Sequence, residues 1–308
     1  MRKYLLIVAF LFTLFIAGCG EQDIIKSESP YIGGIGGMSI AFDPTAPLAE
    51  FTQDDVVDVK VNLVNKGEYA IPADSIKVKL YGLSPEEFNT LSFDYVNVPG
   101  GLFAAEKDIF DEGGQTLVNM GQIDYNGIVS NYIDRELYAK VCYPYETKAS
   151  VETCITSRRA EEAGNDICDY TGEKIEDGFV SAGPIQITSF TQEPRGVNQM
   201  VFRVNLQNHG FGEAFSKDAE CGVYETAVGK LQNEGKVFIK LAPLNVLCSF
   251  SNGQHNEGFV TLDGSEEKVL VCTMDVPEDS QYVQTVEVVA NYNYVDSTST
   301  NIKILGNQ

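Results

Sequence analysis

A nine-residue pattern occurs twice in the chain and constrains the fold more than any other feature. The segment "VKVNLVNKG" covers residues 59–67 and "FRVNLQNHG" covers residues 202–210, with Val, Asn, Leu, Asn and Gly at matched positions. Between residues 57 and 63 every second residue is apolar, which predicts a strand with one buried face. Asn and Gly at the end of each copy tolerate the positive φ of a tight turn. Each copy therefore predicts a strand followed at once by a turn.

A second pair of matched segments lies near the end of each copy. "VCYPYETKAS" contains Tyr143 and Tyr145, and "VANYNYVDSTS" contains Tyr292 and Tyr294. In the second copy, Asn291 stands where Cys142 stands in the first. Both copies therefore contain the same two landmarks in the same order, as expected of a duplicated domain.

Strand-like runs separated by frequent turns fill the space between these landmarks, which predicts a β-sandwich for each copy. A chain of 308 residues also has length for about two domains. We therefore expect an all-β protein with two immunoglobulin-like β-sandwich domains in tandem, over residues 37–157 and 179–306. The polar, Gly-containing segment 158–178 is the expected linker.

The N-terminus has the parts of an export signal. Arg2 and Lys3 precede an apolar stretch that ends at residue 18, which is shorter than the roughly 20 residues a membrane-spanning helix needs. The run from Leu14 to Cys19 resembles the lipobox of prokaryotic lipoproteins. This resemblance implies a signal peptide over residues 1–18, cleavage before Cys19 and a lipid on its sulfur. A short uncleaved anchor, or a plain signal peptide with an incidental cysteine, is the alternative.

Lipidation would place the protein outside the cytoplasm, anchored to the cell membrane or outer surface, because two acyl chains give stable membrane attachment. Residues 19–36 contain several glycines and polar residues. We expect this segment to be a flexible tether between the lipid and the first strand.

Cysteine parity supports an exported protein. The chain has 7 cysteines, and an even number remains once Cys19 is set aside. Those six are Cys142, Cys154, Cys168, Cys221, Cys248 and Cys272. In an oxidising compartment they are expected to form disulfides. Zinc is the less favoured interpretation, because no C-x-x-C pair occurs and the only histidines are His209 and His255.

A hairpin is the expected fold of "CYPYETKASVETC". If it turns near Lys148, Cys142 faces Cys154, and the proline two pairs away, which cannot donate to the ladder, places both cysteines in the non-hydrogen-bonded, closely spaced class of antiparallel pairs. The apolar residues of this segment point to the opposite face. We therefore predict a disulfide between Cys142 and Cys154 on the outer face of the sheet.

The other disulfides follow from sequence context. Cys248 and Cys272 lie in apolar runs separated by a polar loop, so they are expected to pair across neighbouring strands. Cys168 and Cys221 then pair by elimination.

Acidic residues dominate the charge. The formal net charge is −22, and it becomes more negative once the signal peptide with Arg2 and Lys3 is removed. So acidic a chain is not expected to bind nucleic acid or anionic lipid through a basic patch.

A family resemblance rests on the strand-then-N-x-G motif followed by Y-x-Y. Together they resemble the immunoglobulin-like modules called CARDB-like or NEW3-like in prokaryotic surface proteins. "GGMSIAFDPTAP", "NKGE" and "CYPYET" are similar to segments of cell-surface proteins of archaea. The resemblance covers residues 37–305 and implies adhesion or scaffolding. An archaeal origin is the expectation, and bacteria remain the alternative because they also use the lipobox.

No catalytic constellation is present. G-x-S-x-G, H-E-x-x-H and phosphate-binding G-x-x-x-x-G-K-[ST] motifs are missing, and both histidines lie in expected loops. The chain is therefore not predicted to be an enzyme, and no cofactor or metal is expected. Acidic loops at residues 51–58 and 263–267 carry oxygen ligands that calcium prefers, but we interpret them as solvated surfaces.

Binding is the better supported class of function. Tyr81, Tyr95, Tyr125 and Tyr132 are candidates for stacking on sugar rings in a chain without Trp. The sequence predicts a lipid-anchored extracytoplasmic protein with a structural, adhesive or partner-binding role, its partner an envelope protein or polysaccharide. A carbohydrate-binding module is the alternative.

Overall fold

The computed structural model describes residues 28–88, 93–164, 167–251 and 253–307. Strands account for 54% of the chain and helices for 6%, which confirms the predicted all-β class. The expected signal peptide, 1–18, and Cys19 lie outside the described residues. Among the residues that are described, none of the helices has the length and apolar character needed to span a bilayer.

Most elements are short. The strands and helices of the first half are β1 (Met38–Phe42), β2 (Glu50–Thr52), β3 (Val56–Asn65), β4 (Ile76–Tyr81), β5 (Val96–Val98), β6 (Gln115–Asp124), β7 (Tyr132–Thr156) and α2 (Arg158–Glu162). Those of the second half are β8 (Ile185–Arg195), β9 (Gln199–Asn208), β10 (Glu213–Phe215), α3 (Cys221–Tyr224), α4 (Ala227–Asn233), β11 (Lys236–Ala242), β12 (Leu247–Phe250), β13 (Gly253–His255), β14 (Glu257–Thr261), β15 (Lys268–Asp275) and β16 (Gln281–Leu305).

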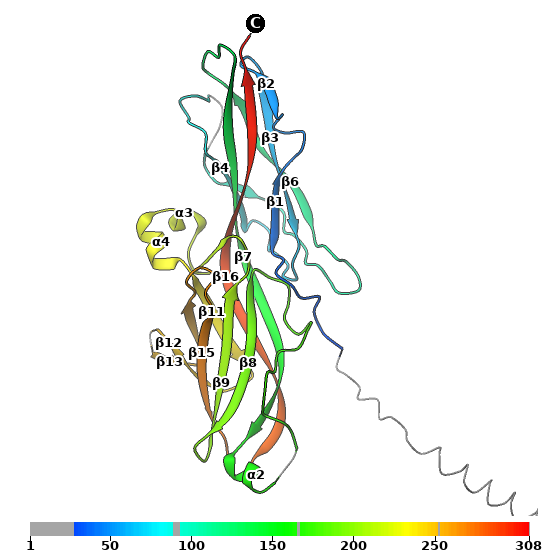
Figure 1. The fold of residues 1–308 in the computed structure, drawn as a ribbon, viewed down its shortest axis with the longest axis vertical. Coiled ribbons are helices and arrows are strands. Elements are labelled where there is room, and N and C mark those ends of the chain that lie inside the picture. The colour runs from blue at the N-terminus through cyan, green and yellow to red at the C-terminus, as the bar shows by residue number, and fades with distance from the viewer. Residues whose placement is uncertain (1–27, 89–92, 165–166, 252, 308) are drawn as a thin grey trace, which may run out of the picture.

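The molecule is elongated, with an upper and a lower lobe along its long axis (Figure 1). In the upper lobe the sheet β1-β3-β6 lies beside β5, β4 and parts of β7 and β16. In the lower lobe the sheet β13-β12-β15-β9-β8 lies beside β14, β11 and the remaining parts of β7 and β16. Each lobe is thus built from antiparallel layers, with a short parallel contact between β2 and β16 in the upper lobe.

Two 25-residue strands, β7 and β16, run through both lobes. They pair antiparallel along their whole length, from Thr156 opposite Gln281 to Tyr132 opposite Leu305. The first half of β7 also pairs with β4 in the upper lobe, and the first half of β16 with β11 in the lower lobe. The second half of each strand continues into the other lobe. Each half of the chain therefore contributes a strand segment to its neighbour's sheet.

The repeat in the sequence corresponds to an approximate internal twofold relation. Tyr143 lies opposite Tyr294, and Tyr145 lies opposite Tyr292, so the two Y-x-Y motifs meet at the junction between the lobes. We call this junction, defined by these four tyrosines, the waist. On either side of the waist, β1, β3 and β6 correspond to β8, β9 and β15, which pair in the same order.

The predicted alternation is present in β3. Val57, Val59, Val61 and Leu63 are buried, as the period of two requires. Their side chains belong to one apolar cluster that continues through the waist into the lower lobe. Burial of these faces positions the turns at the waist.

The expected domain boundaries differ from the observed ones. We expected self-contained domains over 37–157 and 179–306 with a linker over 158–178, but β7 and β16 cross between the lobes. The segment 158–178 is also attached to the lower lobe. Its Lys174 N–H donates to the Phe190 carbonyl, and the Glu173 carboxylate accepts the Phe190 N–H at 2.7 Å.

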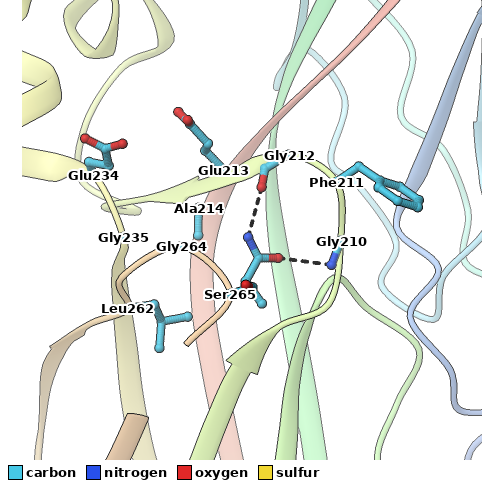
Figure 2. A pocket seen from close by; sticks show the side chains of 11 residues that line it. Gly210, Phe211, Gly212, Glu213, Ala214, Glu234, Gly235, Leu262, Gly264 and Ser265 are labelled. Carbon is cyan, nitrogen blue, oxygen red and sulfur yellow. Dashed lines mark hydrogen bonds between the residues drawn. The ribbon is translucent and has the colours of Figure 1, made fainter. Parts of the chain in front are cut away.

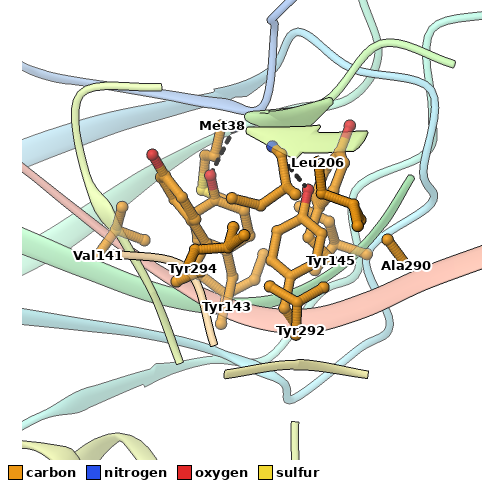
Figure 3. Packing of buried hydrophobic residues seen from close by; sticks show 14 of the residues in the cluster. Met38, Val141, Tyr143, Tyr145, Leu206, Ala290, Tyr292 and Tyr294 are labelled. Carbon is orange, nitrogen blue, oxygen red and sulfur yellow. Dashed lines mark hydrogen bonds between the residues drawn. The ribbon is translucent and has the colours of Figure 1, made fainter. Parts of the chain in front are cut away.

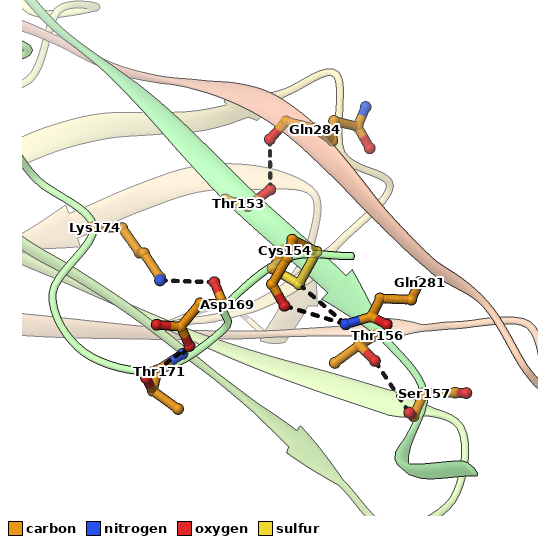
Figure 4. Close-up of a disulfide and its surroundings, with 10 residues drawn as sticks. Thr153, Cys154, Thr156, Ser157, Asp169, Thr171, Lys174, Gln281 and Gln284 are labelled. Atoms are coloured by element: carbon orange, nitrogen blue, oxygen red, sulfur yellow. Dashed lines mark hydrogen bonds between the residues drawn. A yellow bond between two sulfur atoms is a disulfide. The ribbon is translucent and has the colours of Figure 1, made fainter. Parts of the chain in front are cut away.

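The disulfides correct part of the cysteine prediction. The pairs are Cys142–Cys221, Cys154–Cys168 and Cys248–Cys272. Only the last was predicted correctly, and its cysteines lie directly opposite each other on β12 and β15. Figure 4 shows the Cys154 disulfide, whose neighbour Gln281 donates to the Cys168 carbonyl at 3.1 Å.

The hairpin prediction was wrong because the chain does not turn near Lys148. This residue lies within the continuous strand β7, so Cys142 and Cys154 are about 40 Å apart at the rise of a strand. Cys142 does point to the face opposite the main core, as predicted, but it is fully buried there.

The segment that contains α3 and α4 covers that face. It follows β10 in the second half of the chain, and Cys221 at its start bonds to Cys142 on β7. Glu225 next to α3 pairs with Lys79 on β4 at 2.6 Å and with Lys140 on β7 at 3.0 Å. The segment therefore joins the second half of the chain to the sheet of the upper lobe.

The described part of the expected tether, residues 28–36, is bound near the waist. The Glu68 carboxylate accepts the N–H groups of Ile32 at 2.8 Å and Gly33 at 2.9 Å. It also accepts the Ala182 N–H of the lower lobe at 2.7 Å. Glu68 thus ties the N-terminal segment to both lobes, which corrects the prediction of a flexible tether for these residues.

Candidate functional site

The waist is built around four buried tyrosines (Figure 3). Tyr143 and Tyr292 accept equivalent backbone hydrogen bonds, from the N–H of Met38 at 3.1 Å and of Ile185 at 3.2 Å. These N–H groups begin β1 and β8. Burial raises the pKa of both hydroxyls well above the ordinary value, so they stay neutral.

The other two tyrosines lie against the turns that follow β3 and β9, since a Cβ atom on Gly67 would lie 1.7 Å from the Tyr145 hydroxyl and one on Gly210 would lie 2.2 Å from the Tyr294 hydroxyl. The Tyr145 hydroxyl donates to the Ala182 carbonyl at 2.8 Å. The Tyr294 hydroxyl donates to Asn208 Oδ1 at 3.1 Å and accepts the Gly212 N–H at 3.0 Å. With every hydroxyl bound to protein groups, the four tyrosines serve as structural supports.

The turn after β9 is held in one geometry. Asn208 Oδ1 accepts the Gly210 N–H at 3.1 Å, and its Nδ2 donates to the Gly212 carbonyl at 2.9 Å (Figure 2). Asn65 makes the same two bonds in the turn after β3. A Cβ atom on Gly210 would lie 2.2 Å from the Tyr294 hydroxyl, so only glycine fits against the waist. The sequence predicted both turns correctly.

Phe211, in the turn after β9, is a large apolar residue that is exposed to solvent. Its exposed fraction is 98%, and its ring points away from the turn in Figure 2. It lines three cavities of about 250, 500 and 410 Å³. We call these three cavities, which all include Phe211, the waist groove. The first contains Leu262, the second Tyr224, and the third Ile35.

Most charged groups of the waist groove are paired. Glu213 accepts a hydrogen bond from the Tyr224 hydroxyl and pairs with Lys230 at 3.0 Å. Lys140 pairs with Glu225. Burial opposes ionisation of Glu225, but hydrogen bonds from its two lysine partners lower its pKa overall.

Asp296 differs from these carboxylates. It lines two of the three cavities together with Phe211. Its Oδ1 accepts the Ser297 N–H at 2.8 Å, and within the described ranges no lysine or arginine lies within ion-pair distance of it. Burial raises its pKa, although the Ser297 N–H opposes that rise. The waist groove therefore combines an exposed aromatic ring with a carboxylate that forms no ion pair with the lysines lining the same cavities.

The four tyrosines proposed for sugar stacking do not form one platform. Tyr81 stacks on Tyr138 with 5.0 Å between the ring centroids, and Tyr95 donates to Glu225 at 3.1 Å. Tyr125 packs edge-on against a buried phenylalanine. Tyr132 lies at the far end of β7, with Lys303 over its ring.

Of the other residues considered from the sequence, the acidic loop 263–267 borders the first cavity of the waist groove through Gly264 and Ser265. The two histidines and the loop 51–58 are not among the residues that line the groove. His209 is exposed beside Gln207, and His255 is exposed on β13. Asp55, in the acidic loop 51–58, accepts hydrogen bonds from Thr52. Among the described residues, no group of three or more His, Cys, Asp or Glu is arranged to hold a metal ion.

Sequence reasoning missed Phe211 and Asp296. One signal was available: the tight turn has Phe211 at the position where the first copy has Glu68. A large apolar residue in a rigid exposed turn has no role in the core.

The fold and the waist groove define a class: an all-β, disulfide-bonded protein of two joined lobes with a surface groove between them. No protein-family model matches the chain, and no curated protein is similar to it at a significant level.

Proposed function

We propose that this is a lipid-anchored extracytoplasmic protein of the cell envelope that binds a partner through the waist groove. The observation that carries this proposal is the 98% exposure of Phe211 on a turn held by Asn208 and Tyr294. Burying a phenylalanine side chain contributes about 1.5–3 kcal/mol, and aromatic residues are enriched where proteins meet partners. An exposed ring on a turn that hydrogen bonds hold in one geometry is therefore suited to binding.

The disulfides support the extracytoplasmic location. All six cysteines other than Cys19 form pairs, as expected in an oxidising compartment. Cys19 is thereby left as the single cysteine available for a lipid. The layered lobes further support two immunoglobulin-like sandwiches, here joined by the exchange of strand segments between them.

Carbohydrate binding is the second candidate, and the same ring favours it. An exposed aromatic face can stack on the apolar face of a sugar. Phe211, rather than the four tyrosines named from the sequence, would then provide the stacking surface.

Site-specific photo-crosslinking in intact cells tests the proposal. A photoreactive phenylalanine analogue replaces Phe211, and in a control chain it replaces Val197, which is 59% exposed at the lower end of the molecule. We expect a discrete crosslinked protein from position 211 and none from position 197. Equal crosslinking from both positions would contradict a binding role for the waist groove. A polysaccharide adduct at position 211 would select the second candidate.

A further inference from the structure

We propose that the waist groove binds an extended, basic peptide segment of a protein partner, with a lysine or arginine side chain between Phe211 and Asp296. This inference rests on the proposed partner-binding function and names the chemistry of the partner. It is carried by the internal symmetry of the fold and by the charges of the groove.

The upper lobe already contains an extended segment at the equivalent position. Glu68 follows the Asn65 turn as Phe211 follows the Asn208 turn. Residues 31–34 lie against the upper turn, where Glu68 accepts the N–H groups of Ile32 and Gly33. The fold therefore accepts an extended main chain beside this kind of turn, with a carboxylate to receive its amides.

The corresponding position in the lower lobe is open. Phe211 is almost fully exposed, so no described segment covers it. Ile35 and Pro184 line the adjoining cavity, and half of the Ile35 surface is exposed (50%). An added segment would bury the Ile35 side chain together with the Phe211 ring, which gives a favourable contribution to binding.

The charges select a basic segment. The lysines of the groove already have carboxylate partners: Lys66 pairs with Glu112, Lys140 with Glu225 and Lys230 with Glu213. Among the described residues, no lysine or arginine forms an ion pair with Asp296. A cation over the Phe211 ring gains from its negative face, and the same cation compensates Asp296. A neutral sugar would cover this carboxylate without compensating it, and an acidic polymer would be repelled.

Titration of the full chain with three probes tests the inference. The probes are a capped peptide of alternating glycine and lysine, the same peptide with glutamine in place of lysine, and N-acetyl-lysine methylamide. Calorimetry should show the tightest binding for the lysine peptide. We expect Asp296→Asn to weaken it about tenfold, as the loss of one partly desolvated ion pair. Phe211→Ser should weaken it about two- to fivefold through the lost cation–π contact.

Control variants outside the groove, and outcomes that would contradict the proposal, complete the experiment. Asp134→Asn, an exposed position at the far end of β7, and Val197→Ser should bind like the wild type. Equal binding of the glutamine peptide would overturn the role of the cation. If N-acetyl-lysine methylamide bound as tightly as the lysine peptide, the proposal of an extended peptide ligand would be wrong. If both groove variants bound the lysine peptide like the wild type, the proposed location of the site would be wrong. Crosslinks at position 211 without peptide binding would leave the proposed function standing and refute this inference alone.

Discussion

Single residues set the turns on which the waist depends. Asn65 and Asn208 each close their turn with two side-chain hydrogen bonds, and the N-x-G motif allowed both to be predicted. Phe211 and Asp296 could not be assigned in the same way. Their importance depends on which segments and charges lie beside them in space, and a local pattern does not specify that.

Replacement of Asn208 should loosen the turn that presents Phe211. Asn208→Ala removes bonds to the Gly210 N–H and the Gly212 carbonyl, and we expect a loss of about 1–3 kcal/mol of unfolding free energy. Denaturant unfolding measures this change. Asn301→Ala, at an exposed position on β16, is the control and should change stability by less than about 0.5 kcal/mol. Equal effects at the two positions would contradict the structural role of Asn208.

Asp296→Asn should stabilise the protein at neutral pH. Burial raises the pKa of Asp296 in the folded chain, so the folded state holds the proton more tightly than the unfolded state does. Unfolding free energy therefore falls as pH rises from the ordinary carboxyl pKa, about 4, through the raised one. Asn at position 296 cannot ionise, so the variant avoids the free-energy cost of a charged, partly buried carboxylate at neutral pH.

Thermal unfolding across pH checks the expectation. The melting temperature of Asp296→Asn should exceed that of the wild type at pH 7, and the difference should vanish below about pH 4. A variant that is less stable at neutral pH would show that Asp296 has a stabilising partner.

Among the elements, β7 is the one for which prediction from local sequence failed, because a hairpin was expected where the structure has one long strand. Every second residue of β7 from Val141 through Tyr145 and Ala149 to Ile155 is buried on one face, and Cys142 and Cys154 are buried on the other. The stretch around Lys148 also has no Gly, Asn or Asp, the residues that favour tight turns. Both signals indicate one long strand, whereas the cysteine spacing suggested a hairpin. The partner of that strand, β16, is distant in sequence, so its identity had no local signal.

The stability lost when a disulfide is removed should increase with the length of the loop that the disulfide closes. Cys142–Cys221 spans 79 residues and Cys154–Cys168 spans 14. On the chain-entropy relation, removal by paired serine substitutions should cost about 4.5 and about 3 kcal/mol respectively. Denaturant unfolding of the two double variants gives the order. Non-reducing peptide mapping should recover both linked peptides, and a Cys142–Cys154 peptide would refute the arrangement.

At the scale of the whole molecule, the shared strands make the two lobes interdependent. The 25-residue pairing of β7 with β16 and the continuous apolar cluster connect both halves of the chain. The sequence repeat predicted the two similar units. It did not predict that each unit lends a strand segment to the other, because a repeat shows similarity between segments and not how they pair.

The chain should therefore unfold as one unit. We expect a single calorimetric transition whose calorimetric and van't Hoff enthalpies agree. Cleavage within 158–174 followed by reduction should leave the two pieces associated, since β7 and β16 remain paired. Two separate transitions, or separation of folded pieces after reduction, would instead support independent domains.

The attachment of the N-terminal segment near the waist has a mechanical consequence for the proposed anchored protein. The stretch from Cys19 to Glu28 can span at most about 30 Å, and the chain joins the body close to the middle of its long axis (Figure 1). A lipid on Cys19 would then attach the molecule to the membrane near its middle, with one lobe extending to each side of the attachment point. Such a protein would not be attached at one end with its other end projecting away from the membrane. It would keep the waist groove within a few nanometres of the bilayer, where it could meet only partners that approach or belong to the membrane surface.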